Sequence, residues 1–534
     1  MSIKNKTVLA LLTITMVVTV GFFSCGCIED TSDSEIDTSF LKPFELKNKT
    51  LQISSPYEIA LSTPVVLNRG ISLVYTEDCN QVSNPSLFSA RLALTFWESP
   101  ARAYLVDSYE GALIAASIAK MDDCPILWYG NATSTAIKFL NPVDIVGIKL
   151  ADGHNCTVVL MDDTFILDFC QSNGLPLSGY VGVVNLDAPD PATYAAPLLT
   201  AYRNGIIKAV FSDNISEIRD NLIEFGKKLN SITGIPSQYI SLFGGADSIP
   251  HHITPLTLTD ILGQSLDIII YSDNYLACTN TSSESFAIPD VAIGRIVSTN
   301  VTSSLNLCMS YVHYDEFCAS NEPENAVLFS ENVEAEAVSA LCPYISMINL
   351  NKLFIFAGYQ TYTSNSLSST TFAQILSDKL SSADIIYSVF VSPETFLGVD
   401  SFNNAVIFDS SGIHANNNSN LQHHLLGSGS NTYIGSVGYF DAGVSLIRIG
   451  GSYSDPISAA EEGGTPLLAK HFFNTLLNND SSVGIALRNA KNSYCSDINQ
   501  PPGTTEHVSL ACVIYGDPAF NPYEPCNEGT NYGS

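Results

Sequence analysis

Residues 239–250 read Tyr-Ile-Ser-Leu-Phe-Gly-Gly-Ala-Asp-Ser-Ile-Pro, and this stretch decides how the second half of the chain is interpreted. Five residues of strand character run into two glycines and a polar turn, which is the pattern of a buried strand that ends at a sheet edge. Neither G-x-G-x-x-G nor G-x-x-x-x-G-K-[ST] follows, and no basic residue stands nearby, so a nucleotide site is not indicated.

Strands and helices alternate before this stretch, from about Tyr180 onward. A buried strand at 181–186 leads into a helix at 191–203. Asp190 is the predicted N-cap of this helix, and Pro197 predicts a kink. The alternation predicts a parallel α/β sheet.

The next strand is expected at 206–211, and a second amphipathic helix follows it. Asp213 or Asn214 is the predicted N-cap, and Gly234 marks the end of the helix. Its apolar residues recur at helical spacing, which predicts a core-facing stripe. These residues are Ile215, Ile218, Leu222, Phe225 and Leu229.

Residues 51–175 predict a separate parallel-sheet α/β domain. A helix at 112–120 is followed by apolar runs at 125–130 and 143–147. The passage 109–148 is similar to the putative cell-wall-binding repeats. A plain α/β domain explains the same residues.

Further motifs follow in a fixed order: Ser272-Asp273-Asn274-Tyr275, then 288–296, 463–470, 483–492 and 515–518. With residues 239–250 they resemble the gingipain-type cysteine peptidase family over roughly residues 178–525. The resemblance implies a caspase-like fold, in which a His base and a Cys nucleophile lie at the carboxyl ends of neighbouring parallel strands. Such a pair cleaves peptide bonds through an acyl-enzyme.

Both catalytic positions implied by the resemblance hold other residues. The family's His follows a strand of the type 384–387, and Phe390 occupies that place; the family's Cys follows the strand 405–409, and Gly412 stands there. No cysteine occurs from Pro343 to Tyr494, so no shift of the alignment restores the nucleophile. The sequence therefore predicts a pseudoenzyme that binds or scaffolds other molecules.

Three alternatives to this interpretation stay open. His414 is a candidate base for a serine nucleophile at Ser410 or Ser411, although a loop role explains it as well. An active cysteine endopeptidase would need a distant thiol, such as Cys342 or Cys495, brought to the cleft by folding. A purely structural layer component would show neither cleavage nor a defined ligand.

Asp273 and Asp290 are the candidate metal ligands. They flank a polar loop, and paired carboxylates in an exported protein are typical of calcium sites, yet the spacing matches no EF-hand. A structural pairing with Arg295 is the alternative. His251 and His252 are adjacent, so on an extended segment they point in opposite directions and are not expected to share a metal.

The N-terminus predicts export. Lys4 and Lys6 precede an apolar run at 8–23, which has the length of a secretory signal, and the sequence Cys25-Gly26-Cys27 follows. We predict a signal peptide at 1–26, lipidation of Cys27, a polar stalk at 27–50 and a tail at 526–534. An uncleaved anchor or a soluble secreted product are the alternatives, and sequons such as that at Asn131 fit a surface glycoprotein.

Composition limits the partners. The 534 residues are 46% hydrophobic and carry 23 Lys and Arg against 53 Asp and Glu, for a formal net charge of -30. A surface of that sign repels phosphate backbones, so nucleic acid is excluded as a partner. The expected partners are a membrane, through the lipid anchor, and a cell-wall or peptide ligand at the extracellular surface.

Overall fold

The structure is a computed structural model. It describes residues 49–76, 84–150, 156–259, 265–279, 286–314, 325–330, 352–357, 369–389, 393–410, 419–436, 464–479, 481–496 and 504–522, with Phe44, Leu46 and Val391. Several residues singled out above lie outside this part of the chain: Cys27, Cys342, Phe390, Ser411, Gly412 and His414.

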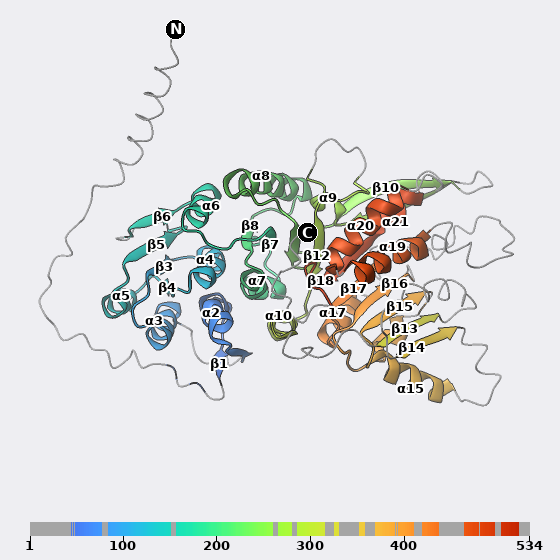
Figure 1. Ribbon diagram of the computed structural model, residues 1–534, viewed down its shortest axis with the longest axis horizontal. Helices are drawn as coiled ribbons and strands as arrows, with labels where there is room; N and C mark the ends of the chain where they lie inside the picture. Colours follow the sequence, from blue (N-terminus) through green and yellow to red (C-terminus); the bar gives the residue numbers. More distant parts are fainter. Residues whose placement is uncertain are drawn as a thin grey trace, which may run out of the picture.

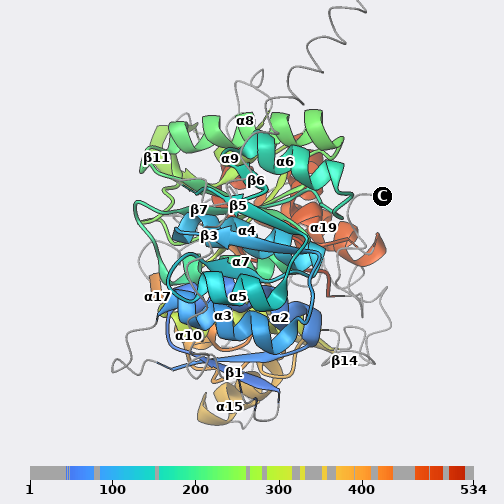
Figure 2. The same ribbon diagram turned by 90° about the vertical axis from the view of Figure 1, so that its left-hand side faces the viewer.

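The N-terminal unit is built on a small parallel sheet with the strand order β4-β3-β5-β6 (Figure 2). Its helix α4 (Tyr109–Asp122) begins at Ser108, whose hydroxyl accepts a hydrogen bond from the Gly111 amide. A separate two-stranded parallel sheet precedes it. The other elements are β1 (Thr50–Ile53), α2 (Pro56–Arg69), β2 (Ser72–Tyr75), α3 (Pro85–Phe96), β3 (Arg102–Val106), β4 (Ile126–Trp128), α5 (Thr133–Leu140), β5 (Asp144–Ile148), β6 (Val158–Leu160) and α6 (Asp163–Ser172).

A ten-stranded sheet forms the rest of the protein, with the strand order β14-β13-β15-β16-β17-β18-β12-β9-β7-β8 (Figure 1). Each half is internally parallel, and the two halves meet at the antiparallel pair β17 and β18. The fold is therefore α/β with parallel sheets, as predicted. The strands are β7 (Tyr180–Asn185), β8 (Ile206–Val210), β9 (Tyr239–Phe243), β12 (Ala292–Ile296), β13 (Asn325–Ser330), β14 (Lys352–Ala357), β15 (Ile385–Val389), β16 (Val406–Asp409), β17 (Thr432–Ser436) and β18 (Cys512–Gly516).

Helices and one hairpin surround this sheet. In β16, Phe408 packs against Phe472 and Phe473 of α19, whereas α17 lies on the opposite face, beside Tyr515 of β18. The hairpin consists of β10 (His252–Thr259) and β11 (Ser265–Ser272). The helices are α7 (Pro191–Tyr202), α8 (Ile215–Thr233), α9 (Asn274–Ala277), α10 (Val301–Val312), α15 (Ser369–Leu380), α16 (Pro393–Leu397), α17 (Ser419–Gly427), α19 (Gly464–Asn478), α20 (Val483–Cys495) and α21 (Thr504–Ala511).

The predicted start of α7 and the predicted start and end of α8 are confirmed. Asp190 caps α7 by accepting a hydrogen bond from the Ala192 amide at 2.7 Å. Asn214 is the N-cap of α8, which decides between the two candidates, and Gly234 ends α8 with φ +76°. The stripe of α8 faces the core, with four of its five predicted residues fully buried.

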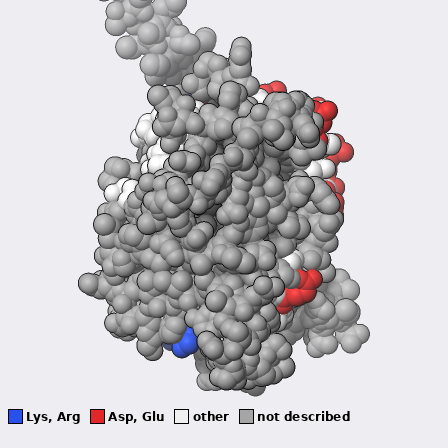
Figure 3. Space-filling model, turned by 90° about the vertical axis from the view of Figure 1, so that its right-hand side faces the viewer, with Lys and Arg blue, Asp and Glu red and all other residues white. Residues whose placement is uncertain are grey.

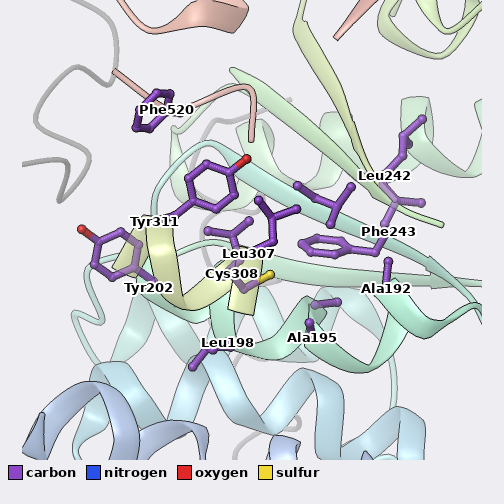
Figure 4. Packing of buried hydrophobic residues seen from close by; sticks show 14 of the residues in the cluster. Ala192, Ala195, Leu198, Tyr202, Leu242, Phe243, Leu307, Cys308, Tyr311 and Phe520 are labelled. Carbon is purple, nitrogen blue, oxygen red and sulfur yellow. The ribbon is translucent and has the colours of Figure 1, made fainter. Parts of the chain in front are cut away.

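The two units share one hydrophobic core. Helix α7 lies between the ten-stranded sheet and the helices α2 and α4 of the N-terminal unit. On its sheet side, Ala192 and Ala195 pack near Phe243 of β9 and Cys308 of α10 (Figure 4). Burial of this continuous apolar surface is the main driving force that joins the units.

A buried ion pair fixes the C-terminal strand to the end of α7. The Arg203 guanidinium donates to Asp517 at 2.5 and 2.8 Å, and both side chains are inaccessible to solvent. The Tyr180 hydroxyl donates to the other oxygen of the same carboxylate. This network ties the end of β18, the last strand within the described residues, to β7 of the large sheet.

In the described residues no helix has both the length and the apolar character that a bilayer span requires.

Candidate functional site

The site implied by the sequence lies at one edge of the large sheet. Strands β15 and β16 are direct neighbours and parallel, with Ile385 opposite Val406 and Ser388 opposite Asp409. The carboxyl ends of both strands therefore lie at the same edge of the sheet. The expected adjacency of these two strands is confirmed, while Phe390, Gly412 and His414 themselves lie outside the described residues.

A buried polar cluster lies at this edge, on the face of the sheet that α17 covers. The Ser388 hydroxyl donates to one Asp409 oxygen at 2.7 Å, and the Tyr433 hydroxyl donates to the other at 3.2 Å. Burial raises the pKa of Tyr433, and the Asp409 charge raises it further, so this phenol stays protonated. The cluster links the carboxyl ends of β15 and β16, which carry the predicted site, to the neighbouring strand β17.

Sequence reasoning missed this cluster. In the sequence Asp409 marks the end of one strand, and Ser388 and Tyr433 belong to two other strands. Polar residues inside otherwise apolar strands were the available signal, because a buried polar group needs a partner. Pairing them required the strand order, which one sequence does not supply.

Two further hydroxyls lie buried at the same strand ends. Tyr387 and Ser410 sit beside each other, yet neither hydroxyl makes a hydrogen bond of normal geometry within the described residues. Ser410 is only 1% exposed. A serine nucleophile needs both access and an imidazole partner, so these contacts do not activate Ser410.

Burial holds most of the described cysteine thiols in the protonated form. Burial raises the pKa to about 12 for Cys124, Cys170 and Cys278, raises it to about 11 for Cys156 and Cys512, and raises it for Cys308. Because the thiolate is the nucleophile, a raised pKa opposes catalysis. The alternative nucleophile Cys495 ends α20, with its sulfur 3.8 Å from the Ala287 carbonyl oxygen.

Asp273 pairs with Arg295, which is the structural alternative to calcium binding that the sequence left open. The guanidinium donates to both carboxylate oxygens, at 2.6 and 3.1 Å, and His251 lies 2.8 Å from one of them. Burial by itself would raise the pKa of Asp273, but the charges of Arg295 and His251 outweigh it and lower that pKa well below its usual range. The carboxylate thus stays ionised in the interior.

The predicted calcium ligands are not drawn into one cluster. Asp290 accepts a hydrogen bond from the Thr279 hydroxyl at 3.4 Å. Across the described ranges, no group of three or more His, Cys, Asp or Glu side chains is placed to hold a metal ion. Calcium at Asp273 and Asp290 stays a prediction. His251 and His252 diverge as expected, since His252 stacks on Tyr275 at 4.0 Å.

A second polar site adjoins the first along the sheet edge. The Lys491 ammonium donates to the side chain of Asn274 and to the Cys512 carbonyl oxygen, each at 2.6 Å. Burial lowers the pKa of Lys491 to about 8. Lys491 and Arg488 of α20 line a cavity against β12 and β18.

Comparisons with known proteins found no match among curated sequences. Among solved structures, one described as "Structure of Protease" aligns over 65% of this chain and 79% of its own, with 11% identity and a TM-score of 0.46. The Arg-specific cysteine proteinase gingipain R aligns over 64% and 78%, with 13% identity and a TM-score of 0.41. The complex of RgpB pro- and mature domains from Porphyromonas gingivalis covers the same shares at 14% identity, with a TM-score of 0.41.

The sequence itself gives the stronger match. The model of peptidase family C25 aligns with residues 203–523, which is more than half of the chain. This range contains every strand of the large sheet except β7, and it includes both strand ends described above. The chain belongs to peptidase family C25, the gingipain family.

Proposed function

We propose that this protein is a cell-surface lipoprotein whose C25 domain binds extended peptides without cleaving them. One observation carries the proposal: no cysteine occurs from Pro343 to Tyr494, the stretch that holds β15, β16 and the segments after them. Without a cysteine in the segments that follow β15 and β16, the family's thiol nucleophile has no counterpart there and its thioester acyl-enzyme cannot form.

The sheet edge supports peptide binding. Strands β15, β16 and β17 end together, and ligands of parallel α/β sheets bind in the crevice beyond the carboxyl ends of the strands. The Asp409 cluster holds these ends in place through contacts to Ser388 and Tyr433. A rigid edge lowers the entropic cost of ordering a ligand.

The proposed location rests on the N-terminus. The apolar run before Cys27 fits a lipoprotein signal, and the family membership agrees with an extracellular or cell-surface protein. Acylation of Cys27, after removal of residues 1–26, would hold the domain at the membrane. Metabolic labelling with a fatty acid tests this step, with Cys27→Ser as the variant that should lose the label.

The decisive experiment incubates the full-length chain, purified in detergent, with an unfolded protein substrate and a thiol-reactive peptide probe. We expect the substrate to stay intact, and extended peptides to bind in a titration. Cleavage that alkylation abolishes would overturn the proposal. In that event, Cys342→Ala and Cys495→Ala would identify which thiol serves the alternative endopeptidase.

A further inference from the structure

The cavity beside Lys491 lies within reach of the peptide edge. Its lining includes the N-terminal ends of β12 and β18, and Cys512 of β18 pairs with Ser436 at the end of β17. Strand β16 is two positions away in the sheet order, roughly 10 Å at the usual strand spacing. The cavity and the predicted site therefore open at one edge of the sheet.

Lys491 brings a buried cation to this cavity. The side chain is 2% exposed, and its ammonium meets two acceptors among the described residues, Asn274 and Cys512. An ammonium has three donors, so one N–H group finds no acceptor within the described ranges and can serve a further one. A buried cation with an unused donor favours an anionic partner.

The charge around the cavity has the opposite sign to the protein as a whole. The chain carries a net charge of -30, and on the face shown in Figure 3 the described charged side chains are mainly acidic. The cavity instead has two basic residues, Lys491 and Arg488, in its lining. Its one acidic residue, Asp273, is neutralised by Arg295.

We propose that this cavity binds a carboxylate group, with Lys491 at its base and Arg488 at its rim. The enclosed space takes about one water-sized group, which suits a carboxylate oxygen and leaves the rest of the ligand in the mouth. Arg488 is half-buried, and its guanidinium lies beside Asn489 at 3.1 Å and near the Asp290 carbonyl oxygen. It can turn toward a second carboxylate oxygen at little cost.

The carboxylate can come from a peptide C-terminus, from an acidic side chain or from a small free acid. This proposal goes beyond peptide binding at β15 and β16 and does not depend on the loss of the catalytic pair. A peptide that lies along the edge would place one such group near Lys491, whereas a small acid would bind by itself.

Calorimetric titration of the full-length chain separates these sources. The probes are acetyl-trialanine with a free carboxylate, the same peptide as its amide, acetyl-Ala-Glu-Ala amide, acetyl-Ala-Gln-Ala amide, and acetate. We expect at least one carboxylate probe to bind about tenfold more tightly than its uncharged counterpart, which corresponds to one charge-assisted hydrogen bond. The acetate arm reports whether the group binds without a peptide.

Variants assign the binding to the cavity. Arg488→Gln and Lys491→Met should each weaken carboxylate binding about tenfold, and Lys228→Met on the exposed face of α8 is the matched control that should leave it unchanged. Arg488 is partly exposed, so its variant should fold even if Lys491→Met does not. Equal binding of charged and uncharged probes, or no binding of any carboxylate at about 10 mM, overturns the proposal. Unchanged carboxylate affinity in both Arg488→Gln and a folded Lys491→Met also overturns it.

Discussion

The Arg295 guanidinium holds the Asp273 carboxylate through two hydrogen bonds, at 2.6 and 3.1 Å, in the interior of the protein. Asp273 follows β11, whereas Arg295 lies in β12, so the pair fixes the base of the hairpin to the large sheet. Arg295 also donates to the carbonyl oxygens of Gly244 and Ile249. The stretch 239–250 is thus anchored by Arg295, which belongs to the family motif at 288–296.

Breaking this pair should destabilise the protein strongly. Asp273→Asn removes the charge and leaves the buried Arg295 guanidinium without a counter-ion, which costs about 3 to 5 kcal/mol. Denaturant titration should show the loss in the free energy of unfolding. Asp123→Asn is the control, because the Arg69–Asp123 pair is exposed and its loss costs about 0 to 1 kcal/mol. Equal losses in the two variants would contradict the assigned role.

Calcium at Asp273 and Asp290 can be tested by thermal unfolding with calcium or with a chelator. Both oxygens of Asp273 already accept hydrogen bonds from Arg295, and a calcium ion would have to compete with that guanidinium. We therefore expect the unfolding midpoint to be the same in calcium and in chelator. A rise of the unfolding midpoint with calcium that Asp290→Asn abolishes would contradict this expectation. It would place a calcium ion at the loop between Asp273 and Asp290.

The order of strands and helices between 180 and 243 could be predicted from the sequence, because apolar periodicity and capping residues act locally. Asp190 and Gly234 each mark an element end by their own chemistry. The Asp409 cluster could not be predicted, since its members come from three strands whose adjacency is set by the whole sheet. The same holds for Lys491, whose two acceptors lie 217 and 21 positions away.

Acid should destabilise the protein in part through His507. Burial lowers the pKa of this imidazole to about 3, so the folded protein leaves it neutral where the unfolded chain protonates it, near pH 6.5. The unfolded state binds more protons in this window, and stability therefore falls as the pH drops from about 6.5 toward 3. We expect His507→Gln to lower the slope of the unfolding free energy against pH by at most about 1.4 kcal/mol per pH unit. Urea unfolding at several pH values measures this slope. Parallel pH profiles for the two proteins would exclude this contribution.

Restoring the two catalytic side chains tests the alignment of the family positions. Phe390→His with Gly412→Cys should place an imidazole and a thiol at the ends of the neighbouring strands β15 and β16. An imidazole beside a thiol lowers the thiol pKa, so the double variant should react with a peptide-linked thiol probe faster than Gly412→Cys alone. Mass spectrometry of the labelled peptide gives the site. If both variants react at the same rate, the two positions do not face each other.

Alkaline pH should stabilise the protein through Lys491. Burial lowers the pKa of this ammonium to about 8, whereas the unfolded chain keeps it charged up to its ordinary pKa of 10.5. Between these values the unfolded state binds the extra proton, so stability rises with pH. The buried tyrosines Tyr180 and Tyr433 act in the opposite direction above about pH 10, and the buried cysteines do so from about pH 8.5, because raised pKa values keep these groups protonated where the unfolded chain is not. Comparison with the Lys491 variant isolates the part that Lys491 contributes. We expect the free energy of unfolding, measured from pH 7 to 10, to rise less with pH in Lys491→Met than in the unsubstituted protein. Lys228→Met should follow the unsubstituted protein. If both variants keep the same pH profile, Lys491 stays charged in the folded state, and its two acceptors compensate for burial more fully than the pKa shift implies.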